Sequence, residues 1–128
     1  MDNEITFGAY LKQKRLDMDL SARELASISG ISPMYICDME KDRRPAPTDE
    51  VLERLANSLN IQAGAERARF YDLAARSKNT VSLDLPDYIM EKDIVRAALR
   101  TAKEYDATDK EWEEFMERIK NRIDKGEK

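Results

Sequence analysis

Residues 21–40 read SARELASISGISPMYICDME, and this stretch decides the fold. Ser21 with Glu24 three residues later is the pattern of a capping box, so a helix is predicted to begin there. Gly30 is expected to end that helix, because glycine reaches positive φ at no steric cost. Ser32 and Pro33 then predict the N-cap and the first turn of the next helix. The stretch therefore predicts two short helices joined through a glycine.

Helical patterns continue on both sides of this pair. A helix from Thr6 to about residue 17 is expected to bury Phe7, Tyr10, Leu11 and Leu16 and to leave Lys12, Lys14 and Arg15 outside. Within the pair, the buried side chains are expected to be Leu25, Ala26 and Ile28, then Ile36 and Met39. Thr48 is expected to cap a fourth helix, and a fifth is predicted over residues 65–77.

The chain is expected to divide near residues 78–86, where helical periodicity lapses and Pro86 restarts it. Residues 1–77 then form a five-helix unit, 78–86 a linker, and 87–125 a pair of helices. The first of these covers about 87–105 and is expected to bury some of its apolar side chains, Ile89, Ile94, Val95, Ala98, Leu99 and Ala102. The second is capped by Thr108 with Glu111. The fold class is all-α: five helices with a two-helix C-terminal extension.

The last helix carries the cleanest apolar stripe of the chain. Trp112, Phe115, Met116, Ile119 and Ile123 recur at the spacing of one helical face. The stripe either packs on the preceding helix, meets the same helices of a second subunit, or binds another protein. Trp112, Phe115, Met116 and Ile119 are therefore candidate dimer or partner contacts.

Composition argues against an enzyme. The chain has no His and one cysteine, Cys37, so it lacks a ready general base and an activated nucleophile. No zinc or calcium pattern and no Gly-rich phosphate loop occurs, and no metal or cofactor is expected. The opening MDNEITF is acidic and no long apolar run follows, which predicts a cytoplasmic protein without membrane contact.

The residues around the helix pair resemble the Xre family of lambda-repressor-like helix-turn-helix regulators. The resemblance covers residues 7–62 and rests on Leu20-Ser21, Glu24-Leu25-Ala26, Gly30-Ile31-Ser32, Tyr35-Ile36, Glu40, Arg44, Pro47, Leu52 and Leu55-Ala56. It implies a DNA-binding domain, usually dimeric, whose third helix enters the major groove of a palindromic operator.

The resemblance also implies site residues. Those facing bases would be Ser32, Pro33, Met34, Cys37 and Asp38, and those near phosphates Ser21, Arg23, Tyr35, Lys41, Arg43 and Arg44. Ala22 departs from the family, because many members have a glutamine there. Asp42 replaces a glycine after the third helix and is expected to adopt the left-handed conformation.

Several of these residues have two readings. Asp38 either accepts from a cytosine amino group or forms a salt bridge with Arg43, Arg44 or Lys41. Cys37 is either a redox sensor or an inert thiol. Arg43 and Arg44 either clamp a phosphate or belong to a solvated loop.

Two functions follow as hypotheses. The first is a dimeric transcriptional regulator, an autorepressor, that places residues 32–41 of each subunit in the major groove of an inverted repeat. The alternative is an antitoxin or other protein-binding module. Net charge favours the alternative, because the chain has 22 basic and 26 acidic residues and residues 1–62 hold eight Lys and Arg against eleven Asp and Glu.

Overall fold

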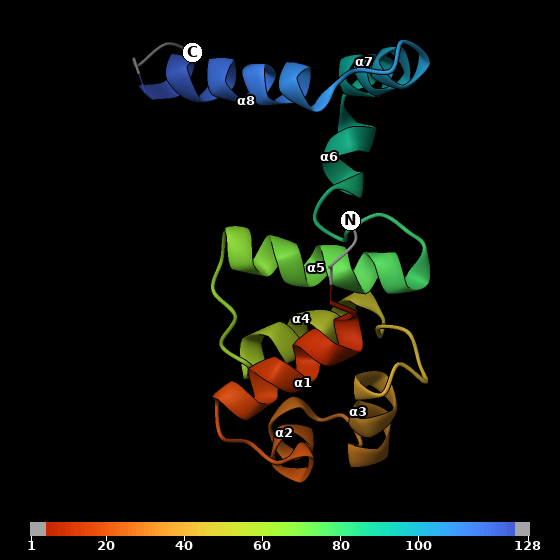
Figure 1. Ribbon diagram of the computed structural model, residues 1–128, viewed down its shortest axis with the longest axis vertical. Coiled ribbons are helices and arrows are strands. Elements are labelled where there is room, and N and C mark those ends of the chain that lie inside the picture. Colours follow the sequence, from red (N-terminus) through yellow and green to blue (C-terminus); the bar gives the residue numbers. More distant parts are fainter. Residues whose placement is uncertain (1–4, 125–128) are drawn as a thin grey trace. The chain divides into compact units, whose positions relative to one another are not determined.

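The computed structural model describes residues 5–124, and every regular element in that range is a helix (Figure 1). This confirms the all-α class. The helices are α1 (Phe7–Asp17), α2 (Ala22–Ser29), α3 (Pro33–Glu40), α4 (Asp49–Ser58), α5 (Ala65–Lys78), α6 (Pro86–Glu91), α7 (Asp93–Glu104) and α8 (Asp109–Asp124). Contacts divide the chain into two compact units, Met1–Pro86 and Asp87–Lys128. No helix in the described range is long and apolar enough to cross a membrane.

The core of the first unit is organised around Phe70 of α5, whose side chain is fully buried. Phe7 and Tyr10 of α1 pack on it, with ring centroids 5.4 and 6.1 Å from that of Phe70. Such aromatic pairs contribute about 0.5–1.5 kcal/mol beyond the area they bury. α1 packs against α5 and also against α3, so it connects the helix pair α2–α3 to the rest of the unit (Figure 1).

The sequence prediction placed three side chains wrongly in this core. Leu16 and Ile28 are exposed, whereas Arg15 is buried. The buried face of α1 follows Phe7, Leu11 and Arg15 at intervals of four residues, and Leu16 lies about 100° further around the helix.

α4 begins after Thr48 as predicted, but the Thr48 side chain makes no capping hydrogen bond. Asp49 and Glu50 instead place negative charge in the first turn, where the helix dipole favours it.

Much of the segment predicted as a linker packs on the first unit. Lys78 is the last residue of α5, and its ammonium group donates to the carbonyl of Pro47 at 2.8 Å. Ser82 is buried and donates to the carboxylate of Asp72, while Leu83 packs against the core. These contacts attach residues 78–83 to the body of the first unit.

The prediction of one helix over residues 87–105, and with it a two-helix extension, is wrong. The chain breaks at Lys92, whose backbone is extended, and α6 and α7 are separate helices. The carbonyls of Ile89 and Met90, left without helical partners, accept hydrogen bonds from the guanidinium of Arg96 at 3.0 and 2.6 Å. The side chain thus satisfies backbone groups that a continuous helix would pair.

The second unit has no buried core in the range described. No side chain among residues 87–122 is buried, and α7 and α8 do not pack side by side. None of the six candidates for burial on the predicted helix is buried, and Ile94 and Leu99 are 74% and 40% exposed. Residue 125, the predicted end of this region, and the side chain of Ile123 lie outside the described part of the chain.

Candidate nucleic-acid interface

Local hydrogen bonds fix the ends of α2 and α3 as the sequence predicts. The Ser21 hydroxyl accepts from the amide of Glu24 at 3.0 Å, and the Glu24 carboxylate accepts from the amide of Ser21 at 2.8 Å. Gly30 ends α2 in the left-handed conformation, with φ of 77°. Ser32 then caps α3 by accepting from the amide of Tyr35 at 3.1 Å. The turn between the helices therefore has little conformational freedom.

One side of α3 is buried and the other is open. Ile36 and Met39 are fully buried in the core. Ser32, Pro33 and Met34 are exposed, Met34 to 75%, and Cys37 and Asp38 are half-buried. All five side chains predicted to face bases thus lie off the buried face, at the start and middle of the helix.

α3 lies unusually close to α1, and Gly8 permits the approach. A Cβ atom at Gly8 would lie 2.2 Å from the carbonyl oxygen of Met39, a distance no side chain can adopt. Beyond α3, Asp42 adopts the left-handed conformation, with φ of 58°, as expected for the residue that replaces glycine. Its carboxylate accepts from the hydroxyl of Thr6, the N-cap of α1, at 3.0 Å.

A buried ion pair also joins α1 to α3. Arg15 donates from Nε and Nη2 to the two carboxylate oxygens of Glu40, at 2.7 and 2.8 Å. Its Nη1 donates to the carbonyl of Leu20 at 2.8 Å, just before α2. The hydrogen bonds to Glu40 raise the pKa of Arg15 above its ordinary value. One guanidinium therefore fixes α1, the start of the pair and the end of α3 together.

Sequence reasoning missed Gly8, Arg15 and Glu40 as residues that position α3. A signal for Arg15 was present, because it follows Phe7 and Leu11 at four-residue intervals on the buried side of α1. Glu40 entered only through the family resemblance, without its partner Arg15. The close approach of the Met39 carbonyl to Gly8 leaves no signal in a single sequence.

Arg44 is held between two residues of α3. Its guanidinium carbon lies 4.8 Å from the centroid of the Tyr35 ring, a cation–π geometry. Its Nε lies 4.0 Å from a carboxylate oxygen of Asp38, which makes a long ion pair. Of the two readings of Asp38, the structure thus contains the contact with Arg44. Arg44 is still largely exposed, as a phosphate-binding side chain must be.

The other predicted phosphate contacts occupy the two ends of the helix pair. Ser21 and Arg23 lie exposed at the N-terminus of α2, where backbone amides and the helix dipole favour an anion. Lys41 and Arg43 lie exposed directly after α3. The positive charges therefore flank the open side of α3 in sequence, although the first 62 residues carry more acids than bases.

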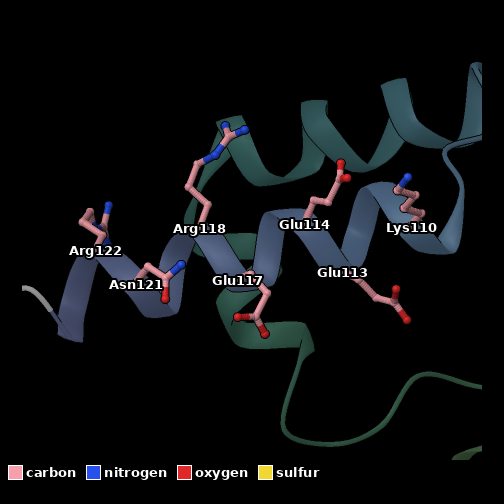
Figure 2. Close-up of a pocket in the computed structure, with 7 residues that line it drawn as sticks. All are labelled: Lys110, Glu113, Glu114, Glu117, Arg118, Asn121 and Arg122. Atoms are coloured by element: carbon pink, nitrogen blue, oxygen red, sulfur yellow. The ribbon is translucent and has the colours of Figure 1, made fainter.

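The four predicted dimer or partner side chains, Trp112, Phe115, Met116 and Ile119, are exposed on α8. Thr108 and Glu111 form the predicted capping box, with hydrogen bonds of 2.9 and 3.1 Å. Figure 2 shows the polar face of the same helix, where charged side chains project to both sides. All residues lining the hollow beside it belong to α8, so this is an open helix surface. Residues 5–124 contain no group of His, Cys, Asp or Glu side chains that could hold a metal ion.

The fold and the open, capped third helix define a helix-turn-helix domain of the class found in DNA-binding regulators. Residues 11–64 match the family model described as helix-turn-helix, in agreement with the resemblance to the Xre, lambda-repressor-like regulators. A solved structure titled SinR protein/SinI protein complex matches 93% of this chain and 99% of that chain, at 20% identity and a TM-score of 0.47. A comparison with curated proteins finds no match.

Proposed function

We propose that the chain acts in the cytosol as a dimeric transcriptional autorepressor. Each subunit inserts Ser32–Lys41 into the major groove of one half of an inverted-repeat operator. The observation that carries this proposal is α3 itself: Ile36 and Met39 anchor one face in the core, and the side chains at the start of the opposite face, Ser32, Pro33 and Met34, are exposed. A major groove about 12 Å wide admits one such helix.

The open face of α3 supplies the base contacts in this proposal. Ser32 offers a hydroxyl, Asp38 can accept from a cytosine amino group, and Met34 can contact a thymine methyl. Pro33 and Cys37 contribute shape more than hydrogen bonds. Specificity therefore depends on few polar contacts.

The phosphate contacts come from both ends of the pair. The amides of the first turn of α2, with Ser21 and Arg23, bind one phosphate, and Lys41, Arg43 and Arg44 bind phosphates beyond α3. Tyr35 orients Arg44 through the ring contact at 4.8 Å. These local charges offset the net negative charge of the domain, so the salt dependence of binding reports on a small number of phosphates.

Selection of bound genomic fragments with purified protein tests the proposal. We expect one palindrome with half-sites about one helical turn apart. Failure to enrich any sequence, even at low salt, would refute operator binding.

Two substitutions then separate the proposed roles. Arg44→Ala should weaken binding to operator and random DNA alike and reduce the slope of log affinity against log salt by about one. Asp38→Ala should mainly relax specificity. Lys110→Ala, which removes the same charge from the second unit, is the matched control. Equal losses on both DNAs for both interface variants would contradict the division of roles.

The exposed apolar side chains of the second unit favour a second candidate function, an antitoxin or other module that binds a protein. Together with the net charge of −4, they suit a basic partner such as a small toxin. Co-expression with the product of an adjacent gene tests it: a stable complex is expected, and its absence would count against this candidate.

A further inference from the structure

The helices of the second unit do not bury their own apolar side chains in the described range. These apolar side chains have no core to enter: Ile94 is 74% exposed, Phe115 is 51% exposed, and no residue of 87–122 is buried. Helices of 12 and 16 residues, such as α7 and α8, are marginally stable in water without tertiary packing. The helices of the second unit therefore leave these side chains available for packing against another helix.

The apolar stripe of α8 has the spacing of a helix-pairing seam. Trp112, Met116 and Ile119 are separated by four and three residues, the alternation that keeps a seam facing a neighbouring helix. Phe115 lies beside the seam, and its ring meets that of Trp112 edge to face, with centroids 6.0 Å apart. The polar face shown in Figure 2 is centred on the opposite side of the helix, and by helical spacing Glu113 and Arg122 lie at its two edges, next to the seam. α8 thus presents one narrow apolar seam and a solvated back.

The charges that flank this seam identify its occupant. By helical spacing, Glu113 and Lys120 lie along one side of the seam, and Glu111 and Arg122 along the other. On each side the acidic residue precedes the basic one in the sequence. The midpoint of each acid–base pair falls between residues 116 and 117. All four side chains are exposed. The seam is therefore self-complementary when a second α8 runs in the opposite direction.

We propose that α8 pairs with α8 of a second copy of this chain, antiparallel, about a two-fold axis near Met116. Glu113 then faces Lys120 of the second copy and Glu111 faces its Arg122, and by symmetry each contact occurs twice. A parallel pair would instead place the acidic halves together and the basic halves together, which is unfavourable. This pairing deepens the proposed function, on which it rests, by assigning the interface of the dimer.

Two charge-reversed variants of the full chain test the pairing. The variant Glu113→Lys makes the Glu113 and Lys120 side of the seam basic at both positions, and Lys120→Glu makes it acidic at both. Glu111 is left unchanged because its carboxylate caps α8 at Thr108. Each should dimerise less well than the wild type, raising the dimer dissociation constant on the order of tenfold to a hundredfold at low salt and less at high salt. Mixed in equal amounts they should form a heterodimer, because every facing pair is again opposite in charge.

Sedimentation equilibrium measures these constants, and the double variant Glu113→Lys/Lys120→Glu, which exchanges the acid and the base, is the control for folding. It should recover wild-type dimerisation, since it restores every facing pair. A wild-type chain that stays monomeric, or charge-reversed variants that dimerise as tightly as the wild type, would overturn the pairing. A mixture that stays monomeric would also overturn it.

DNA selection on the same proteins separates this inference from the proposed function. If the wild type selects a palindrome but the charge-reversed variants dimerise as tightly as the wild type, the pairing is refuted and the operator proposal stands. Charge-dependent dimerisation with no enriched DNA would refute operator binding and leave the pairing intact.

Discussion

Replacing Glu40 by Gln tests whether its ion pair with Arg15 holds α3 in place. The variant keeps the shape of the side chain but removes its charge. The buried guanidinium of Arg15 would then face a neutral amide. The amide oxygen can accept a hydrogen bond from one guanidinium nitrogen, but the amide NH2 group would point its own hydrogens at the other nitrogen. We expect a large loss in the free energy of unfolding, with α3 the first element to lose its position.

The magnitude follows from how deeply the pair is buried. The side chains of Arg15 and Glu40 are 11% and 6% exposed, and two hydrogen bonds shorter than 3 Å join them. Removing one member of such a pair costs about 3–5 kcal/mol, whereas exposed pairs contribute about 0–1 kcal/mol. Because domains of this size are stable by about 5–15 kcal/mol, the loss is a large fraction of the total.

Urea denaturation followed by circular dichroism measures the effect in the full chain. Arg15→Met, Glu40→Leu and their combination complete a double-mutant cycle. Each single change leaves a buried charge without its counterpart, while the combination leaves none, so the double variant should be more stable than either single variant. Single losses below about 1 kcal/mol, as for an exposed pair, or simple additivity of the two changes, would refute the reasoning.

Three further predictions concern the same unit. Gly8→Ala should destabilise it by about 1–3 kcal/mol, because the new Cβ would overlap the carbonyl of Met39, and an unchanged melting temperature would contradict this. Ser21→Ala should cost about 1 kcal/mol of unfolding free energy through the lost cap, and Ser21→Gly only a few tenths; equal effects in urea denaturation would argue against the cap. The hydrogen bond from Lys14 lowers the pKa of Glu66 below its ordinary value. The ionised carboxylate therefore stabilises the folded state at pH values above the ordinary carboxyl pKa, and this stabilisation is lost as the pH falls through the lowered pKa. Glu66→Gln should therefore unfold at lower urea than the wild type at neutral pH and at the same urea in strong acid, and a difference that persists in acid would exclude this origin.

Much of the first unit could be predicted from the sequence because its signals are local. The capping box at Ser21, the left-handed Gly30, the Ser32 cap and the turn at Asp42 depend on a few neighbouring residues whose backbone preferences hold in most contexts. Periodicity then identified the buried face of α3, and with it the open face that carries the candidate base contacts.

The same kind of reasoning failed where side chains meet across the fold. Arg15 is buried because Glu40, 25 residues away, accepts its hydrogen bonds, and the break at Lys92 coincides with bonds that Arg96 makes to the preceding helix. The spacing of Arg15 after Phe7 and Leu11 indicated the buried side of α1, but a charged side chain is ordinarily expected outside and an apolar one inside, so neither the buried Arg15 nor the exposed Ile94 was predicted.

The sequence by itself determined where most helices begin and end, which face of α3 is free, and the self-complementary order of charges along α8. Only the tertiary structure decided that α3 is fixed to α1 through Gly8 and the Arg15–Glu40 pair. It also decided that the second unit has no core of its own in the described range. The physical reason is that caps and turns are set by near neighbours, whereas burial depends on residues distant in the chain, whose positions are fixed only when the helices pack.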